Sequence, residues 1–246
     1  MKIGIIGVGN IGTTLAQRLP RAGHDVLVAN SRGPETIEAD VTSAGARAVT
    51  AQEAATEVDV LILSIPLARI PDLAPVVAAA DERTVVIDTS NYYPARDGQI
   101  EALDDGQVES EWVVEQLGRS IVKAWNAVLA DTLAAAGSGD AGRIAIPVAG
   151  DDERASAVAR QLVEETGLDA VDAGSLSESW RQQPGSPVYC TSLTAEQIPS
   201  ALAAAQKDRL PRRRDLAIDV ITNKVDDPSA TVDAAFLTQL NRLLYR

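Results

Sequence analysis

The chain has 246 residues, of which 46% are hydrophobic, and a formal net charge of −13. This size and apolar content suit one large domain, or a domain with a small appendage, because they allow a substantial buried core. The excess of acidic residues argues against nucleic acid and anionic lipid as partners, since both are bound mainly through Lys and Arg. One cysteine, Cys190, and one histidine, His24, exclude an internal disulfide and leave little material for a metal site.

No segment approaches the roughly 20 consecutive apolar residues that a membrane helix needs. The first residues, MKIGIIGVGNIG, enter a strand-like apolar run and contain glycines where a signal peptide would carry an A-x-A cleavage pattern. We therefore expect a cytoplasmic protein with no metal and no membrane partner.

Apolar strand-like runs alternate with amphipathic helical runs through the first 174 residues. The expected strands cover residues 2–7, 25–29, 46–50, 58–64, 83–89, 120–126, 143–150 and 168–174. The expected helices between them cover residues 10–23, 34–45, 51–57, 70–80, 110–118 and 151–167. Continuous apolar strands separated by helices are typical of a parallel sheet that is covered on both faces. The predicted fold class is α/β, with a doubly wound, mostly parallel sheet.

The pattern changes from about Ser175 onward. Residues 175–193 are rich in turn formers, and two helical stretches at 194–206 and 230–246 are separated by a basic segment at 207–215. We therefore divide the chain into a main domain at 1–174 and a small, mainly helical C-terminal segment at 175–246, which would serve substrate or subunit contacts. Because the last helix is apolar, a homodimer is a further expectation.

Three glycines follow the first predicted strand and open the first predicted helix in the spacing G-x-G-x-x-G. In this pattern Gly7 permits a tight turn, Gly9 lets the backbone approach a pyrophosphate, and Gly12 lets the helix pack closely on the strand. The N–H groups at the start of the helix would face the anion. Glycines also occur in ordinary strand-to-helix turns. At the start of an α/β chain, however, the motif predicts a Rossmann-like dinucleotide-binding domain at 1–174.

The second predicted strand ends in Asn30, Ser31 and Arg32, about 20 residues after the glycines. An NAD site usually carries Asp or Glu at this position to accept the ribose 2′-hydroxyl group. Here no carboxylate would repel a 2′-phosphate, Ser31 can donate a hydrogen bond, and Arg32 can pair with the dianion. The predicted cofactor is therefore NADP, although Glu35 lies close by in the sequence and a solvated loop arginine is the alternative.

Other residues follow strands whose carboxyl ends should meet at the same crevice. Ser64, Ile65 and Pro66 end one such strand, and the amides Asn91 and Asn126 follow two others. Either amide alone is equally well explained as a turn residue or a helix cap.

Few side chains offer acid–base chemistry. His24 is expected at the sheet edge opposite the site, and Cys190 is expected to pack rather than react. Residues that can lie on the substrate side are Tyr92, Tyr93, Trp125, Trp180, Arg181 and Tyr189. An imine or ketone substrate would need a proton donor. The available donors are Tyr92, Tyr93, Tyr189 and Lys123.

Together these stretches resemble the family of NADPH-dependent coenzyme F420 reductases, also called F420H2:NADP+ oxidoreductases, whose fold is shared by the reductase domain of the STEAP metalloreductases. The matching segments, within roughly residues 1–180, are KIGIIGVGNIG, VANSR, LILSIP, IVKAWNAV and residues 148–174. The resemblance implies that NADP is held by Gly9, Asn10, Ile11, Ser31 and Arg32, and that the nicotinamide lies near Ser64, Ile65 and Ala124 to Asn126.

The chain also departs from this family. A basic residue often follows the Ser-Arg pair there, whereas Gly33 to Thr36 occupy that stretch here. The tail from Trp180 onward is longer than in the compact reductases, so the substrate need not be the one that this family uses.

The predicted function is an NADP-dependent oxidoreductase that transfers a hydride between NADPH and a second acceptor, with a deazaflavin such as coenzyme F420 as co-substrate. Transfer between two stacked rings depends on orientation more than on acid–base groups, and such groups are scarce in this sequence. Two alternatives stay open. One is an NADPH-dependent reductase of a small imine, ketone or flavin, and the other is a non-catalytic NADP-binding sensor.

Overall fold

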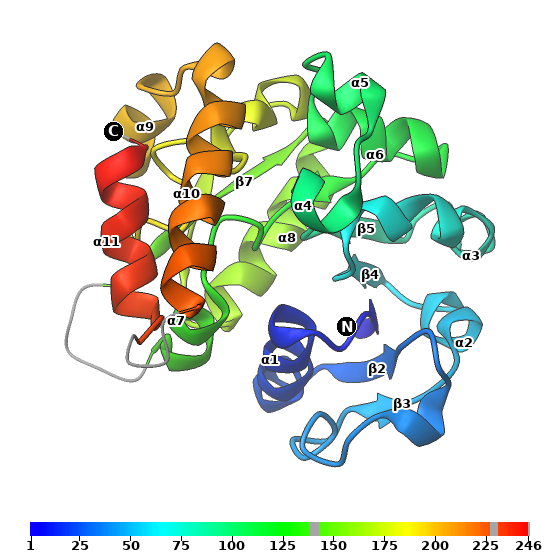
Figure 1. The fold of residues 1–246 in the computed structure, drawn as a ribbon. Coiled ribbons are helices and arrows are strands. Elements are labelled where there is room, and N and C mark those ends of the chain that lie inside the picture. The colour runs from blue at the N-terminus through cyan, green and yellow to red at the C-terminus, as the bar shows by residue number, and fades with distance from the viewer. Residues whose placement is uncertain (138–142, 227–230, 246) are drawn as a thin grey trace.

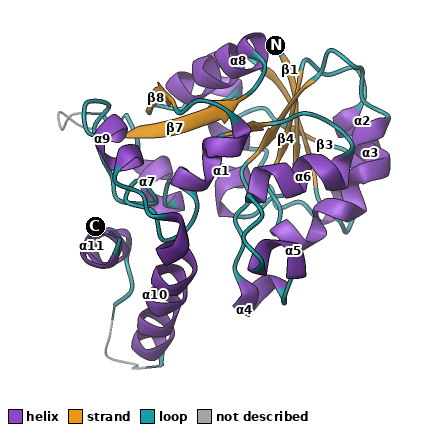
Figure 2. Ribbon diagram, turned by 90° about the horizontal axis from the view of Figure 1, so that it is seen from above, coloured by secondary structure: helices purple, strands orange, loops and turns teal. Residues whose placement is uncertain are grey.

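The computed structural model describes residues 1–137, 143–226 and 231–245. Within them, eight strands form one sheet in the order β3-β2-β1-β4-β5-β6-β7-β8, with helices on both faces (Figures 1 and 2). The strands are β1 (Lys2–Ile6), β2 (Asp25–Ala29), β3 (Arg47–Ala48), β4 (Val60–Leu63), β5 (Val85–Asp88), β6 (Val122–Lys123), β7 (Ala145–Gly150) and β8 (Asp169–Asp172). Neighbours from β1 to β6 pair in parallel, β7 is antiparallel to β6, and β8 is parallel to β7. The predicted doubly wound, mostly parallel α/β sheet is confirmed.

Two apolar clusters, one on each face, explain why the strands are continuously hydrophobic. On one face Leu15, Leu133 and Leu162 are fully buried against the sheet. They come from α1 (Asn10–Arg18), α7 (Ala130–Ala135) and α8 (Glu153–Glu165). The opposite face is covered by η3 (Leu67–Leu73), α2 (Ala51–Ala55), α3 (Ala74–Ala78) and α6 (Glu109–Leu117). A sheet covered in this way exposes its strand ends, where a ligand can bind.

Polar side chains fix the starts of several helices. Thr50 and Glu53 form a reciprocal capping box at the start of α2, and Asp152 accepts a hydrogen bond from the Ala155 N–H at the start of α8. Such caps satisfy N–H groups that have no partner within the helix. Two short helices, α4 (Pro94–Asp97) and α5 (Glu101–Asp104), follow β5.

The C-terminal segment lies beside the β7 part of the sheet and away from β2 and β3 (Figures 1 and 2). It contains η4 (Leu176–Gln182), α9 (Ile198–Ala203), η5 (Lys207–Arg209), α10 (Leu210–Val225) and α11 (Ala234–Leu244). An apolar cluster joins α10 and α11 to the rest of the chain and includes Ala127, Tyr189, Cys190, Ala217, Leu240 and Tyr245. The last helix therefore finds a packing partner within its own chain. The homodimer stays a prediction, as does the division of the chain at residue 174.

Two expected elements differ from the structure. The helix expected at 34–45 is wrong, because only Pro34–Thr36 forms a short 3-10 turn (η2). Thr36, Thr42 and Ser43 donate side-chain hydrogen bonds to carbonyl groups three residues earlier, which competes with helix formation.

The basic segment 207–215 is not a spacer, because it forms η5 and the beginning of α10. Pro211 stands in the first turn of α10, where its missing N–H costs nothing. The last predicted helix is found as α11, and its expected end residues 230 and 246 lie outside the described residues. Among the helices of the described ranges, none has the length and hydropathy that a membrane crossing requires.

Candidate cofactor site

A cavity of about 360 Å³ opens where β1, β2 and β4 end. It is lined by Ile6, Gly7, Val8, Gly9, Asn30, Ser31, Arg32, Ala51, Ser64, Ile65, Pro66, Arg69, Asp72 and Leu73. The cavity thus brings together three segments that the sequence predicted separately, namely the glycine turn, the Ser-Arg pair and the end of β4. This edge of the sheet is where open α/β sheets bind ligands.

Gly7 and Gly12 are required by the packing of the protein itself. Gly7 has a φ of +110°, and a Cβ atom built on it would lie 2.1 Å from the Ser64 carbonyl oxygen. A Cβ atom on Gly12 would lie 1.9 Å from the Gly7 carbonyl oxygen. The tight turn and the close contact of helix with strand therefore have the physical causes that the motif predicts.

Gly9 is different, because no heavy atom lies within 4 Å of a Cβ atom built on it. Its φ of −72° is also open to any residue. Gly9 is the N-cap of α1. The first N–H groups of the helix, on Asn10, Ile11 and Gly12, have no acceptor within the helix, and Gly9 has no side chain that could cap them. Such a helix start attracts an anion. The open space at Gly9 fits a pyrophosphate that approaches the backbone.

The Ser31–Arg32 turn is shaped by Asn30. The Asn30 Oδ1 atom accepts hydrogen bonds from the Arg32 and Gly33 N–H groups, each at 2.9 Å, and its Nδ2 atom donates to Thr36 Oγ1 at 2.8 Å. Asn30 therefore lines the cavity while its side chain is engaged in the turn. The guanidinium of Arg32 has no ion-pair partner among the described residues and is exposed, so it is free to bind a phosphate.

In the sequence, the nearby carboxylate of Glu35 was an argument against NADP, but Glu35 does not line this cavity. Its carboxylate lies against Gly33, where its two oxygens are 2.6 and 2.7 Å from the position of a built Cβ atom. A lining residue that the sequence did not predict is Arg69 in η3, whose Nη2 atom pairs with Asp72 Oδ2 at 2.7 Å. Its only sequence signal is an arginine shortly after a strand end.

Asn91 and Asn126, predicted near the nicotinamide, contact each other and do not line this cavity. Asn91 Nδ2 donates to the Asn126 carbonyl at 2.9 Å, and Asn126 Nδ2 donates to Asn91 Oδ1 at 3.1 Å and to the Gln182 carbonyl at 2.9 Å. Gln182, which sequence reasoning missed, donates from Nε2 to Asn126 Oδ1 at 2.9 Å. The Asn126 side-chain amide uses both N–H donors and its oxygen within the protein, and Ala124 is fully buried. This network therefore holds the backbone around Asn126 in place. Contact of these residues with the cofactor stays a prediction.

Each candidate proton donor already has partners inside the protein. Lys123 is fully buried, and its Nζ atom lies 2.6 Å from Asp88 Oδ2 and donates to the Ser90 carbonyl at 2.5 Å. Tyr93 donates to the Tyr189 hydroxyl at 2.8 Å, and burial raises the pKa of both phenols well above its usual value. These phenols therefore stay protonated at neutral pH.

The last of these donors, Tyr92, donates to Asp104 Oδ1 at 2.9 Å, and burial raises its pKa as well. Trp125 has an unusual φ of +55° and is buried, with its indole N–H donating to Thr166 Oγ1 at 3.2 Å. Trp180 lies under the guanidinium of Arg181, at 4.3 Å from ring centroid to Cζ. The aromatic residues therefore have packing roles of their own.

His24 and Cys190 stay outside the site. The His24 ring lies 2.6 Å from Glu165 Oε2, just before β2 and hence at the opposite edge of the sheet. Burial raises the pKa of the Cys190 thiol to about 12, so it is not a nucleophile at neutral pH. Within the described ranges no three His, Cys, Asp or Glu residues gather as metal ligands.

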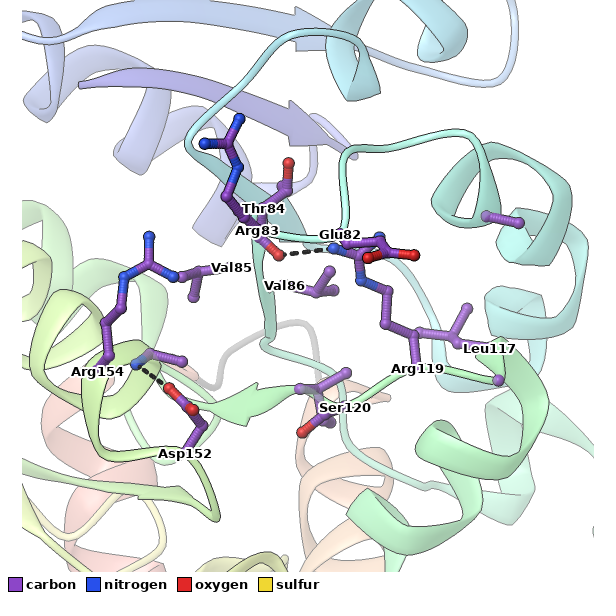
Figure 3. A pocket seen from close by; sticks show the side chains of 14 residues that line it. Glu82, Arg83, Thr84, Val85, Val86, Leu117, Arg119, Ser120, Asp152 and Arg154 are labelled. Atoms are coloured by element: carbon purple, nitrogen blue, oxygen red, sulfur yellow. Dashed lines mark hydrogen bonds between the residues drawn. The ribbon is translucent and has the colours of Figure 1, made fainter.

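A larger groove of about 620 Å³ lies at the opposite edge, where β5 and β6 begin (Figure 3). Its lining mixes the cations Arg83, Arg119 and Arg154 with the anions Glu82 and Asp152. Arg119 is turned to backbone carbonyls, including that of Thr84 at 2.9 Å. Because ligands of such sheets bind beyond the carboxyl ends of the strands, the smaller cavity is the candidate cofactor site.

A doubly wound sheet with a glycine turn and an uncapped helix start after its first strand is typical of Rossmann-type nucleotide-binding proteins. The family model described as NADP oxidoreductase, coenzyme F420-dependent, matches residues 2–92. The hypothetical protein SMa0349 from Sinorhizobium meliloti is 32% identical, with a TM-score of 0.68 over 79% of this chain and 96% of that one. The chain belongs to this family of NAD(P)-dependent oxidoreductases, which confirms the resemblance seen in the sequence.

Two further similarities are more limited. A candidate F420-dependent NADP reductase from Arthrobacter sp. FB24 is 20% identical, with a TM-score of 0.57 over 73% of this chain and 87% of that one, and shows the fold alone. The protein YjhV of Escherichia coli strain K12 is 46% identical over 69 residues, which are 28% of this chain. That match spans half the length of YjhV.

Proposed function

We propose that the protein transfers a hydride between NADPH and a deazaflavin of the coenzyme F420 type. The observation that carries the proposal is the cavity, which joins the open approach at Gly9 to the Ser31–Arg32 turn and has no carboxylate from that turn in its lining. The family's description as coenzyme F420-dependent supports the choice of acceptor.

The residues divide the binding task among them. The first turn of α1 holds the pyrophosphate through its N–H groups, and Gly9 leaves room for it. Ser31 and Arg32 hold the 2′-phosphate, with Asn30 fixing their turn. Ser64 to Pro66 line the side of the cavity at the end of β4 and orient the reactive half of the cofactor. When bound, NADPH supplies the hydride, and a deazaflavin takes up this hydride and one proton while NADP+ is left.

The contacts of the candidate proton donors favour a deazaflavin over a carbonyl or an imine as the hydride acceptor. A ketone or imine would need a protein acid close to the reacting atom. Three of the four candidate donors, Tyr92, Tyr93 and Lys123, already donate to partners within the protein. The fourth, Tyr189, is buried and accepts the hydrogen bond of Tyr93. Transfer between two rings needs no protein acid, because the chemistry belongs to the cofactors, the protein orients them, and the one proton can come from water.

The test is to mix the purified protein with NADPH and to follow its near-ultraviolet absorbance with and without oxidised coenzyme F420. We expect turnover only with the deazaflavin, accompanied by loss of its visible absorbance, and faster turnover with NADPH than with NADH. Turnover with free flavin, a ketone or an imine in its place would identify the rival reductase. Tight NADPH binding without turnover of any acceptor would indicate a sensor.

A further inference from the structure

The cofactor cavity contains a second arginine that the site described so far does not use. Arg69 is in η3, which follows β4, whereas Arg32 follows β2. In the sheet, β1 lies between these two strands, so the two arginines line the cavity from either side of the glycine turn. They are the two cationic side chains of its lining, and Asp72 is the one anionic side chain there.

The charge of the ligand calls for more than one cation. A phosphate monoester carries about −1.5 to −2 charges at neutral pH, and one guanidinium supplies one positive charge. Glu35, the acid nearest in sequence to Arg32, does not line the cavity. The net charge of the cavity lining therefore depends on Arg32, Arg69 and Asp72.

The contact between Arg69 and Asp72 leaves Arg69 available. It is a single ion pair at 2.7 Å between residues three apart, and the two side chains are 67% and 56% exposed. A pair so exposed contributes little stability, because water screens it and two flexible side chains must be ordered. A guanidinium has five N–H donors, and this pair is the one contact that the described residues give to it. Asp72 therefore limits where Arg69 lies and leaves most of its N–H donors unused.

We propose that Arg69 is a specificity-determining residue that, with Arg32, clamps the 2′-phosphate of NADP from the β4 side of the cavity. This inference rests on the NADP assignment made above. It assigns the discrimination between NADPH and NADH to two arginines from separate segments, with Asp72 holding the second one at the cavity wall.

The test measures equilibrium dissociation constants for NADPH and NADH by titration, with no acceptor present, in the intact protein and in Arg69→Ala. We expect Arg69→Ala to weaken NADPH binding about tenfold, as loss of a charged hydrogen-bond partner predicts, and to change NADH binding less than about twofold. The double variant Arg32→Ala/Arg69→Ala should lose the preference for NADPH altogether.

The matched control is Arg83→Ala. Arg83 also forms a short-range, exposed ion pair, with Asp81 at 3.2 Å, but it lies outside the cofactor cavity. The control removes the same charge from the protein, and we expect it to leave both dissociation constants unchanged.

Two results would overturn the inference. Equal losses for NADPH and NADH would place Arg69 on the adenine or the pyrophosphate, and an unchanged NADPH affinity would leave it paired with Asp72 in solvent. The proposed function fails differently, because then the unaltered protein itself would bind NADPH no better than NADH or would turn over no deazaflavin.

Discussion

At the scale of single residues, the glycine turn separates positions that the fold requires from a position that a ligand requires. Gly9→Ala places a Cβ atom in open space, whereas Gly12→Ala places it 1.9 Å from a carbonyl oxygen. We expect Gly9→Ala to leave the melting temperature within a few degrees of the unaltered protein and to weaken NADPH binding at least about tenfold. We expect Gly12→Ala to lower the melting temperature strongly, because the contact is backbone and cannot move aside.

The two variants control for each other, since they make the same chemical change three residues apart. Thermal unfolding and an NADPH titration on both proteins are sufficient. If Gly9→Ala were to bind NADPH normally, the pyrophosphate would not approach Gly9, and the placement of the cofactor in this cavity would be wrong.

A second residue, Glu109, makes stability depend on pH. It is 5% exposed at the start of α6, and burial raises the pKa of its carboxyl group from 4.5 to about 7, although Lys123 and Arg214 oppose this rise. Since the folded pKa is above the unfolded one, the folded protein binds more protons between these values. The contribution of Glu109 is therefore full below pH 4.5 and lost as the pH rises to about 7.

The variant Glu109→Gln removes this titration and keeps a side chain of nearly the same shape. Compared with it, we expect the unaltered protein to lose about 3 kcal/mol of unfolding free energy between the two pKa values, which follows from about 1.4 kcal/mol per pKa unit. Urea unfolding of both proteins at several pH values within that window measures the difference. Parallel pH profiles would show that Glu109 has an ordinary pKa in the folded protein.

At the scale of elements, a buried ion pair holds the ends of β5 and β6 together next to the site. Lys123 and Asp88 are both fully buried and their atoms lie 2.6 Å apart. Lys123→Met leaves the Asp88 carboxylate buried without its partner, so we expect a loss of about 3 to 5 kcal/mol in urea unfolding. The double variant Lys123→Met/Asp88→Asn should recover a large part of this loss. If the single variant were as stable as the double variant, Lys123 would not be needed to offset a buried charge on Asp88.

The elements also show what sequence patterns can and cannot predict. The strands were predictable because both faces of the sheet are buried, which gives long apolar runs such as Val60–Leu63. The helix expected at 34–45 failed because side chains such as Ser43 bond to nearby carbonyls, a competition that apolar spacing does not reveal. The glycine turn and Arg32 were predictable from spacing along one segment. Arg69 and Gln182 were not, because only the folded chain brings Arg69 to the cavity and Gln182 to Asn126.

At the scale of the whole molecule, hydrogen bonds tie the C-terminal segment to the sheet domain. Ser179 donates to Ser110 at 2.8 Å, and Gln182 bonds with Asn126, both in buried surroundings. Further contacts are the Tyr93–Tyr189 hydroxyl pair and the Arg214 guanidinium 5.2 Å from the Tyr92 ring centroid. Separating the segment at residue 174 would leave these buried polar groups unpaired, which is costly. We therefore expect residues 1–174 and 175–246 to unfold as one cooperative unit.

Cofactor binding tests this cooperativity, because the cavity lies at the ends of β1, β2 and β4 while α10 and α11 lie beside β7. A ligand present at about 100 times its dissociation constant stabilises the state it binds by about 2.7 kcal/mol. If the chain unfolds as one unit, NADPH should raise the melting temperature by several degrees, and equally by two probes. Helical circular dichroism reports on the whole chain, and the fluorescence of Trp180 reports on the C-terminal segment in a variant with Trp112 and Trp125 replaced by Phe. If NADPH did not raise the melting temperature measured by Trp180 fluorescence, the segment would unfold independently of the cofactor domain.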